Sequence, residues 1–282
     1  MKIFIPNDSE QGLGGGWTFK RNLEKGLNQI GHQVVNNAVG ADVALVVGVT
    51  MVKWDTMQSI KALGKKIIVR LDNVPRNSRN RNTGTSRLKG FSDMADEVVW
   101  QCEWARFYLA DFVGKVGKVI YNGVDTDIFN PVGSSFDSAY KENTYLYSRF
   151  NRDETKNWEV AWYKFQLIYR ANPKAKLIIV GKFAPENIEY KFDFFRGENV
   201  EYKGIVEDPE DMAKIYRSCK YLMATYYNDC YSNTYQEFLS CGGELYQPDM
   251  SGGTPELIKN GVINLKEMAI KYVALFKDVL NR

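Results

Sequence analysis

The sequence predicts an α/β protein with two doubly wound domains, each a parallel sheet covered by helices on both faces. Three observations support this prediction. Short apolar runs of strand length alternate with patterns of helical period, a turn-rich segment at 121–140 interrupts the alternation, and a second alternating series follows it. The 282 residues are also enough for two domains of roughly 100–150 residues each.

The first series of predicted elements precedes the turn-rich segment. It comprises strands at 2–6, 33–36, 43–48, 66–71, 97–101 and 118–121 and helices at 17–30, 56–63 and 103–112. Parallel strands need long crossover connections, and an intervening helix usually provides them. The stretch 75–86 is polar and aperiodic, and we predict a loop there.

The second series follows the turn-rich segment. It comprises strands at 144–148, 176–180, 200–202 and 221–225 and helices at 158–171, 209–218, 234–240 and 265–280. In doubly wound folds ligands bind beyond the carboxyl ends of the strands. We therefore expect the functional residues in the loops that follow strands.

Composition excludes several classes of protein. With 44% hydrophobic and 25% charged residues, the chain is not fibrous, collagenous or disordered. No apolar run approaches the ~18–20 residues of a membrane-spanning helix, and the first residues resemble a strand instead of a secretion signal. The four cysteines and one histidine lack metal-ligand spacing. We therefore expect a cytoplasmic protein with no integral membrane segment and no bound metal.

Charge is distributed unevenly along the chain. The formal net charge of +3 identifies no partner, but residues 1–130 contain 17 Lys and Arg against 13 Asp and Glu, and the remainder contains 20 against 21. No acid lies between Asp72 and Asp93. The bases in that interval are Arg76, Arg79, Arg81, Arg87 and Lys89. This pattern predicts an electropositive loop in the N-terminal domain.

A glycine-rich turn, Gly12-Leu13-Gly14-Gly15-Gly16, follows the first strand and opens a helix. Unobstructed backbone amides at a helix N-terminus can bind a phosphate group. A merely flexible turn is the alternative interpretation. The turn matches neither G-x-x-x-x-G-K-[ST] nor a clean G-x-G-x-x-G, which argues against a P-loop NTPase and against a dehydrogenase.

Two acids, Asp229 and Glu237, lie eight positions apart around the start of a predicted helix. A carboxylate that accepts two hydroxyl hydrogen bonds is suited to reading a ribose or another sugar. The alternative is that Asp229 forms a turn and Glu237 is a solvated helix residue.

The sequence around these acids resembles the retaining GT-B glycosyltransferases of family 4. That family carries E-x7-E, then A-C-G, then G-G-x-P-E-L-I. The corresponding residues here are Asp229 to Glu237, Ser240-Cys241-Gly242-Gly243 and Gly252-Gly253-Thr254-Pro255-Glu256-Leu257-Ile258. Further matches are Val119-Ile120-Tyr121-Asn122-Gly123-Val124-Asp125, Phe129-Asn130-Pro131 and Tyr202-Lys203-Gly204-Ile205-Val206. Ser148-Arg149 with Lys156-Asn157 is similar to the basic pair of the family.

The resemblance implies a role for each matching residue. Glu237 would bind the ribose of the nucleotide, and Asp229 would face the donor sugar. Arg149 and Lys156 would neutralise the diphosphate, although ordinary surface cations are the alternative. Further donor-binding groups would come from Gly15, Gly16, Ser232, Asn233 and Thr234.

Two positions depart from the family pattern. Asp72 stands where the family often has a histidine, so Asp72 would bind a hydroxyl or act as a base. Arg70 would be its partner or a phosphate ligand on the acceptor side, together with Arg76, Arg79 and Arg81. His32 lies in a helix-to-strand turn and is expected to be structural. Asp229 is one methylene shorter than the usual Glu.

The predicted function is the transfer of a sugar from a nucleoside diphosphate sugar to an acceptor hydroxyl with retention of configuration and without a metal or other cofactor. Domains are expected at 1–130 for the acceptor and 131–264 for the donor, facing a cleft, with a helix at 265–282 that crosses back to the first domain. We expect an anionic or saccharide acceptor, with a glycan, a lipid-linked saccharide and DNA with hydroxymethylated bases as candidates.

Two rival interpretations remain. The first is a catalytically inactive GT-B-like protein that binds nucleotide sugar or nucleic acid. The second is a nucleotide-dependent oxidoreductase or epimerase, which the absence of a Tyr-x-x-x-Lys pair after a proper G-x-G-x-x-G disfavours. The donor base, the sugar and the oligomeric state do not follow from the sequence.

Overall fold

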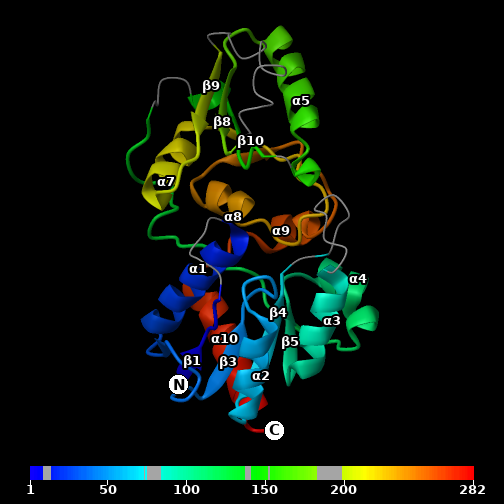
Figure 1. Cartoon of the computed structure of the whole chain (residues 1–282). Coiled ribbons are helices and arrows are strands. Elements are labelled where there is room, and N and C mark those ends of the chain that lie inside the picture. Colours follow the sequence, from blue (N-terminus) through cyan, green and yellow to red (C-terminus); the bar gives the residue numbers. More distant parts are fainter. Residues whose placement is uncertain (9–13, 73, 75–83, 137–140, 152, 183–198) are drawn as a thin grey trace. The chain divides into compact units, whose positions relative to one another are not determined.

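The computed structural model describes all residues of the chain except 9–13, 73, 75–83, 137–140, 152 and 183–198 (Figure 1). The described residues form two compact units. Unit 1 consists of Met1–Val124 together with Pro255–Arg282, and unit 2 consists of Asp125–Thr254. Each unit has its own sheet and its own helices.

Unit 1 is built around a six-stranded sheet in which every adjacent pair of strands is parallel. The strands are β1 (Lys2–Phe4), β2 (Gln33–Val35), β3 (Val43–Val46), β4 (Lys66–Leu71), β5 (Glu97–Trp100) and β6 (Lys118–Val119), in the order β2-β1-β3-β4-β5-β6. All four residues of β3 are buried, as are the last five of β4. Such continuous apolar strands are typical of a parallel sheet covered on both faces.

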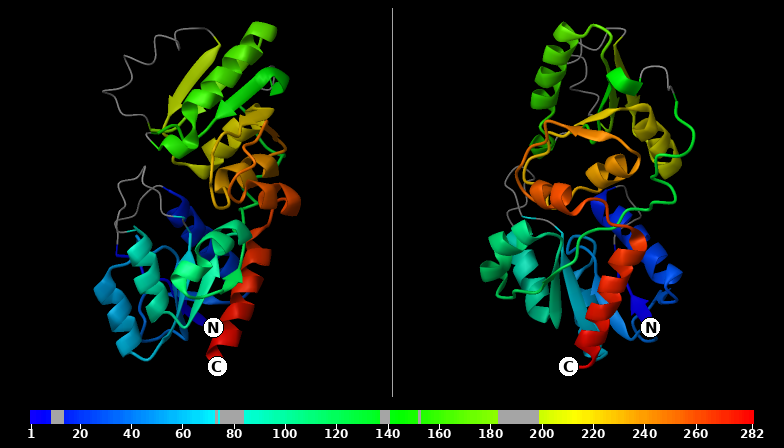
Figure 2. Two further views of the ribbon diagram at one scale, coloured as in Figure 1. Left: turned by 90° about the vertical axis from the view of Figure 1, so that its right-hand side faces the viewer. Right: turned by 180° about the vertical axis from the view of Figure 1, so that it is seen from behind.

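Helices cover both faces of this sheet. The helices of this unit are α1 (Gly15–Gln29), α2 (Trp54–Ala62), α3 (Gly84–Met94), α4 (Glu103–Val113), α9 (Thr254–Asn260, in unit 1 from Pro255 on) and α10 (Leu265–Leu280). Figure 2 shows α10 and α2 on opposite sides of the sheet. Helix α10 packs along α1, and α3 packs on both α2 and α4.

The last helix, α10, belongs to unit 1. Its buried apolar side chains form a stripe, and the helix packs along α1. A Cβ atom at Gly26 of α1 would lie 2.6 Å from the carbonyl oxygen of Leu265, so only glycine allows this approach of α1 to α10. A capping box starts α10, since Asn264 accepts from the backbone N–H of Glu267 at 2.9 Å and the Glu267 carboxylate accepts in return. These features fix where α10 begins.

Unit 2 contains a five-stranded sheet, also entirely parallel. Its strands are β7 (Thr144–Tyr147), β8 (Lys176–Val180), β9 (Val200–Gly204), β10 (Tyr221–Met223) and β11 (Glu244–Tyr246), in the order β11-β10-β7-β8-β9. Its helices include α5 (Trp158–Ala171), α7 (Pro209–Ser218) and α8 (Asn233–Ser240), which alternate with the strands along the chain.

The structure confirms the prediction of two doubly wound parallel α/β units, although the sequence analysis missed some of their helices and strands. Helix α3 begins in the stretch predicted as loop, and neither α9 nor β11 was predicted. The compact units also divide at 124/125 and 254/255, whereas the predicted boundaries lie at 130/131 and 264/265. Among the described residues, no helix is both long and apolar enough to cross a membrane.

Candidate functional site

A cluster of three charged side chains lies in unit 2, on loops that follow β7 and β10. Lys156 Nζ is 2.8 Å from Asp229 Oδ2, and Arg149 Nη1 is 3.2 Å from the same oxygen. The Lys156 side chain is only 2% exposed, whereas Arg149 is 33% exposed. We call these three residues the charge cluster. The structure thus brings together three of the residues that the sequence analysis assigned to the donor.

Buried tyrosines hold the backbone that carries the two cations. Tyr226 donates its hydroxyl to the carbonyl of Ser148 at 2.6 Å, next to Arg149, whose backbone is left-handed with φ 61°. Tyr147 donates to the carbonyl of Lys156 at 2.8 Å. The Tyr226 ring also lies under both cations, with Lys156 Nζ 5.0 Å and the Arg149 guanidinium 5.8 Å from its centre. The cations are therefore held in place before any ligand binds.

The G-G-T-P segment holds Asp229 from the other side. Gly253 donates its backbone N–H to the Asp229 carbonyl at 2.8 Å, and Ser251 Oγ accepts from the backbone N–H of Asn228 at 2.7 Å. Gly252 has φ 63°, and a Cβ atom there would lie 2.3 Å from the Asp229 carbonyl oxygen. Glycine is thus required at 252 for the loop to reach Asp229.

Burial changes the acidity of the cluster. Burial, and after it the Arg149 cation, lower the pKa of Lys156, while Asp229 counteracts both effects, and together these influences bring the pKa to about 8. A lysine with this pKa is mostly protonated at neutral pH and loses its charge just above it. Desolvation raises the pKa of the Tyr226 hydroxyl well above its usual range, so this group stays a hydrogen-bond donor.

Helix α8 begins beside the charge cluster in sequence and carries the second acid. Ser232 is its N-cap and accepts from the backbone N–H of Tyr235 at 3.4 Å, and Asn233 and Thr234 form the first turn. Glu237 is 9% exposed and accepts a hydrogen bond from the Tyr216 hydroxyl at 3.1 Å. Burial and the nearby Glu237 charge raise the pKa of Tyr216 well above its usual range, so Tyr216 remains a donor.

Asp72 of unit 1 lies where the glycine-rich turn enters α1. A Cβ atom at Gly48 would be 3.3 Å from Asp72 Oδ2, and one at Gly16 would be 3.9 Å from it. Gly15 is exposed, and nothing lies within 4 Å of its Cβ position. His32 precedes β2 and so lies at the amino edge of the sheet, whereas Asp72 follows β4 at the carboxyl edge.

Arg70 was predicted on the acceptor side as the partner of Asp72 or as a phosphate ligand, and its contacts favour the first alternative. It is 2% exposed and donates to the Val47 carbonyl and to Asn122 Oδ1, both at 2.9 Å. Its guanidinium carbon lies 3.7 Å from the centre of the Phe19 ring, and Nη1 is 3.6 Å from Asp72 Oδ2. The geometry supports a role in positioning Asp72, because the group is enclosed by protein. Arg76, Arg79 and Arg81 lie outside the described residues.

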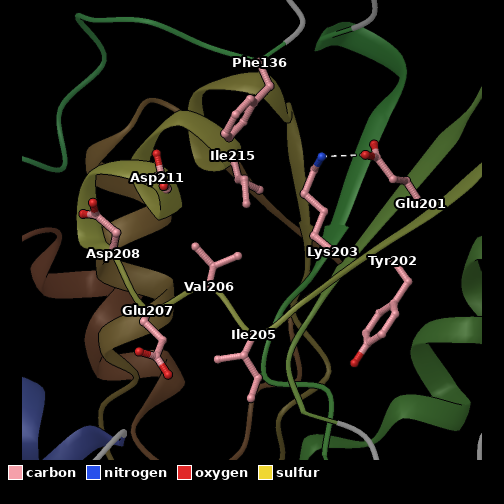
Figure 3. Close-up of a pocket in the computed structure, with 10 residues that line it drawn as sticks. All are labelled: Phe136, Glu201, Tyr202, Lys203, Ile205, Val206, Glu207, Asp208, Asp211 and Ile215. Atoms are coloured by element: carbon pink, nitrogen blue, oxygen red, sulfur yellow. Dashed lines mark hydrogen bonds and ion pairs between the residues drawn. The ribbon is translucent and has the colours of Figure 1, made fainter.

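A surface pocket of about 470 Å³ lies elsewhere in unit 2, between the loop after β9 and α7 (Figure 3). It is lined by Phe136, Glu201, Tyr202, Lys203, Ile205, Val206, Glu207, Asp208, Asp211 and Ile215. Four of these side chains are acidic, and Lys203 is paired with Glu201 at 2.5 Å. Such a lining repels a diphosphate, so the pocket is a poor place for one.

The sequence analysis missed two of the groups that shape the site. Neither Tyr147 nor Tyr216 is among the residues that the sequence analysis named. Both are tyrosines at buried positions of a strand and a helix, which is the only signal the sequence offered. Within the described ranges, no group of three or more His, Cys, Asp or Glu residues is placed to hold a metal ion.

No protein-family model matches the sequence, and no curated protein sequence matches it either. Solved structures do match. HepE of Anabaena, crystallised with UDP and glucose, is 13% identical over 98% of this chain and 90% of its own, with a TM-score of 0.65. Sucrose-phosphate synthase of Thermosynechococcus elongatus is 16% identical over 99% and 90%, with a TM-score of 0.69.

A third similar structure is an alpha-glucosyltransferase in complex with UDP and a 13-mer DNA containing an HMU base. It is 12% identical over 100% of this chain and 90% of its own, with a TM-score of 0.59. These neighbours are GT-B glycosyltransferases, and the GT-B fold predicted from the sequence is thereby confirmed. At such low identities the likeness establishes the fold.

Proposed function

We propose that this protein transfers a sugar from a nucleoside diphosphate sugar to an acceptor hydroxyl, with retention of configuration. The observation that carries the proposal is the charge cluster, because two preplaced cations meet one carboxylate at the carboxyl edge of a parallel sheet, close in sequence to a helix N-terminus. Ligands of doubly wound folds bind at this edge. Similar structures with UDP or glucose bound support the same class of donor.

Arg149 and Lys156 would bind the donor diphosphate. When the bond between the sugar and the diphosphate breaks, negative charge accumulates on the leaving phosphate. Cations and amide groups that are already in place stabilise this charge without reorganising. Ser232, Asn233 and Thr234 would add hydroxyl and backbone donors at the positive end of α8. In this arrangement the chain's own cations replace a metal ion, so we propose that no metal is required.

Glu237 would bind the ribose. A buried carboxylate has about four acceptor positions, enough for the Tyr216 hydroxyl and two ribose hydroxyls. Asp229 would face the donor sugar beside the diphosphate. The Tyr216 bond fixes the carboxylate orientation, and this preorganisation reduces the entropy lost on binding.

Unit 1 would bind the acceptor. Asp72 is the candidate for accepting a proton from the acceptor hydroxyl or for binding a hydroxyl, with Arg70 as its positioning partner. Gly15 leaves backbone at the start of α1 open for a phosphate of the donor, whereas a Cβ atom at Gly16 would lie 2.8 Å from Met51 Sδ, so glycine at 16 lets the helix approach Met51. The basic segment with Arg76, Arg79 and Arg81 favours an anionic acceptor, and a DNA acceptor would make activity fall steeply with salt. Activity that is constant between low and moderate salt excludes nucleic acid.

A thermal-shift panel of nucleoside diphosphate sugars tests the donor proposal. A ligand at 100 times its dissociation constant stabilises its protein by about 2.7 kcal/mol, which is a clear shift. The Glu237→Ala variant should lose that shift, and Glu244→Ala, an exposed acid of the same unit, should keep it. A shift without transfer or hydrolysis would favour the inactive binding protein.

The four cysteines are free and buried, which accords with the proposed cytoplasmic location.

A further inference from the structure

We propose that the Asp229 carboxylate is an internal competitor of the donor diphosphate, holding Lys156 and Arg149 while the site is empty and releasing them when a ligand binds. The inference rests on the proposed role of these two cations as diphosphate ligands. It adds a means of regulating the same site, because the affinity for nucleotide is then set partly by an acid of the protein.

The contacts place Asp229 where a ligand phosphate would need to act. A single oxygen, Oδ2, lies 2.8 Å from Lys156 Nζ and 3.2 Å from Arg149 Nη1. Both contacts are hydrogen bonds between charged groups, the one from Lys156 being the shorter, and a phosphate oxygen could accept the same two bonds. A diphosphate that binds both cations must therefore share them with the carboxylate or displace it.

Burial explains why the empty site needs such an anion. Lys156 is 2% exposed, and a buried ammonium beside the Arg149 cation is unfavourable unless an opposite charge lies next to it. Asp229 provides that charge, and its own 16% exposure leaves an open side from which a ligand can approach. Asp153 also favours the charged form of Lys156 electrostatically, and the Tyr226 ring centre lies 5.0 Å from Lys156 Nζ.

Backbone contacts fix the loop that carries Asp229. Asp229 is tied down through its backbone by Gly253 on one side, while Gly252 packs against its carbonyl. A carboxylate on a fixed loop is present at the cations at a high effective concentration, so it returns to them as soon as the product leaves. Asp229 thereby keeps affinity for the charged product low.

Calorimetric titration with UDP at pH 6.5 and low salt tests the inference on the full chain. Asp229→Asn removes the competing charge and should bind UDP about tenfold or more tightly than the wild type. The reason is that the Asp229 carboxylate and a ligand phosphate, at about 4 Å from each other in a partly buried site, would repel each other substantially. Its melting temperature without ligand should fall, since Lys156 loses its counterion. A merely structural role of Asp229 would lower both affinity and melting temperature.

Three further variants complete the design. Asp229→Ser also lacks the charge and should tighten UDP binding, which provides a second test if Asp229→Asn does not fold. Asp229→Glu keeps the charge and should not tighten it. Asp211→Asn removes an acid paired with Lys214 on α7 of the same unit, so it controls for net charge and should change UDP affinity less than twofold.

The outcomes separate this inference from the proposed function. UDP binding by the wild type with no tightening in Asp229→Asn and Asp229→Ser overturns the inference and leaves the nucleotide site standing. A wild type that binds neither UDP nor any other nucleoside diphosphate overturns the proposed function, and the inference with it.

Discussion

Each unit places an arginine and an aspartate together at the carboxyl edge of its sheet, yet the two pairs differ in exposure and in partners. In unit 1, Arg70 is 2% exposed and both of its Nη atoms are hydrogen-bonded within the protein. In unit 2, Arg149 is 33% exposed and shares one Asp229 oxygen with Lys156. The first arginine is part of the framework, and the second is accessible to a ligand.

The difference shows that residue type and strand position do not determine a role by themselves. Arg70 is on β4 and points into the unit, where it stacks on Phe19, so its charge stabilises the fold around Asp72. Arg149 lies beyond the end of β7 on left-handed backbone, which turns its side chain toward the loop after β10. The exposure of the guanidinium and the groups that it contacts decide whether an arginine supports the fold or can bind a ligand.

The largest expected effect is a loss of folding stability when the buried arginine, Arg70, is replaced. Arg70→Met leaves the buried Val47 carbonyl and Asn122 Oδ1 without their donor, and we expect the free energy of unfolding to fall by about 3–5 kcal/mol. Urea denaturation measures this. Arg282→Met removes an exposed arginine that is also ion-paired and should cost less than about 1 kcal/mol. Equal stability of the two variants would contradict a framework role for Arg70.

The next effect concerns ligand affinity instead of stability. Lys156→Met removes the buried cation of the charge cluster, and we expect UDP affinity to fall about 100-fold, which corresponds to about 2.7 kcal/mol. Calorimetry measures the dissociation constant. Lys174→Met, an exposed lysine of the same unit, should leave it unchanged. A Lys156→Met protein that binds UDP as the wild type does would place the diphosphate elsewhere.

Most of the fold could be predicted from the sequence because apolar runs of strand length alternate with patterns of helical period along the chain. Helix α10 spans Leu265–Leu280, as predicted. Helix α3 was missed because it depends on distant partners. Arg87 donates to the Val49 and Val52 carbonyls, and the Phe91 ring meets the edge of Trp54 at 5.4 Å. Such contacts leave no periodic pattern in the sequence.

The site was predicted in its residue types but not in its contacts. Arg149, Lys156 and Asp229 were named from motifs, yet their shared oxygen depends on left-handed backbone at Arg149 and on the close approach of Gly252. For Arg70 the sequence left two roles open, partner of Asp72 or phosphate ligand, because a strand-end arginine has the same sequence signature whether it is buried or exposed. Tertiary packing supplied this information.

A smaller effect would extend the comparison to a positioning residue. Tyr216→Phe removes the hydroxyl that holds Glu237 but keeps the ring, which packs between Phe129 and Phe238. We expect the dissociation constant for UDP to rise about tenfold, because a hydrogen bond to a charged group is worth about 1.5–3 kcal/mol and only part of it affects the ligand. For 2′-deoxy-UDP, which lacks one ribose hydroxyl, the variant should differ less from the wild type. An equal loss for both ligands would assign Tyr216 a structural role only.

The smallest effect expected near neutral pH is a change in UDP affinity with pH. It distinguishes Lys156, which loses its charge, from Arg149, which keeps it. The pKa of Lys156 is lowered to about 8 by burial and by Arg149, so Lys156 is charged below pH 8 and neutral above it. Because a diphosphate binds the charged form, UDP affinity should be about half its maximum at pH 8 and fall about tenfold by pH 9. Titrations between pH 7 and pH 9 measure this dependence.

Lys156→Arg is the matched variant, since a guanidinium keeps its charge throughout this range. It should bind UDP with little change between pH 7 and pH 9. Folding stability should show the opposite sign, because Lys156 has its usual, higher pKa in the unfolded chain. The unfolded state therefore holds the extra proton above pH 8, and the Lys156 contribution makes the native state more stable as the pH rises. Affinity and stability that fall together above pH 8 would show that another group titrates there, since a lysine whose pKa is lowered on folding produces opposite trends.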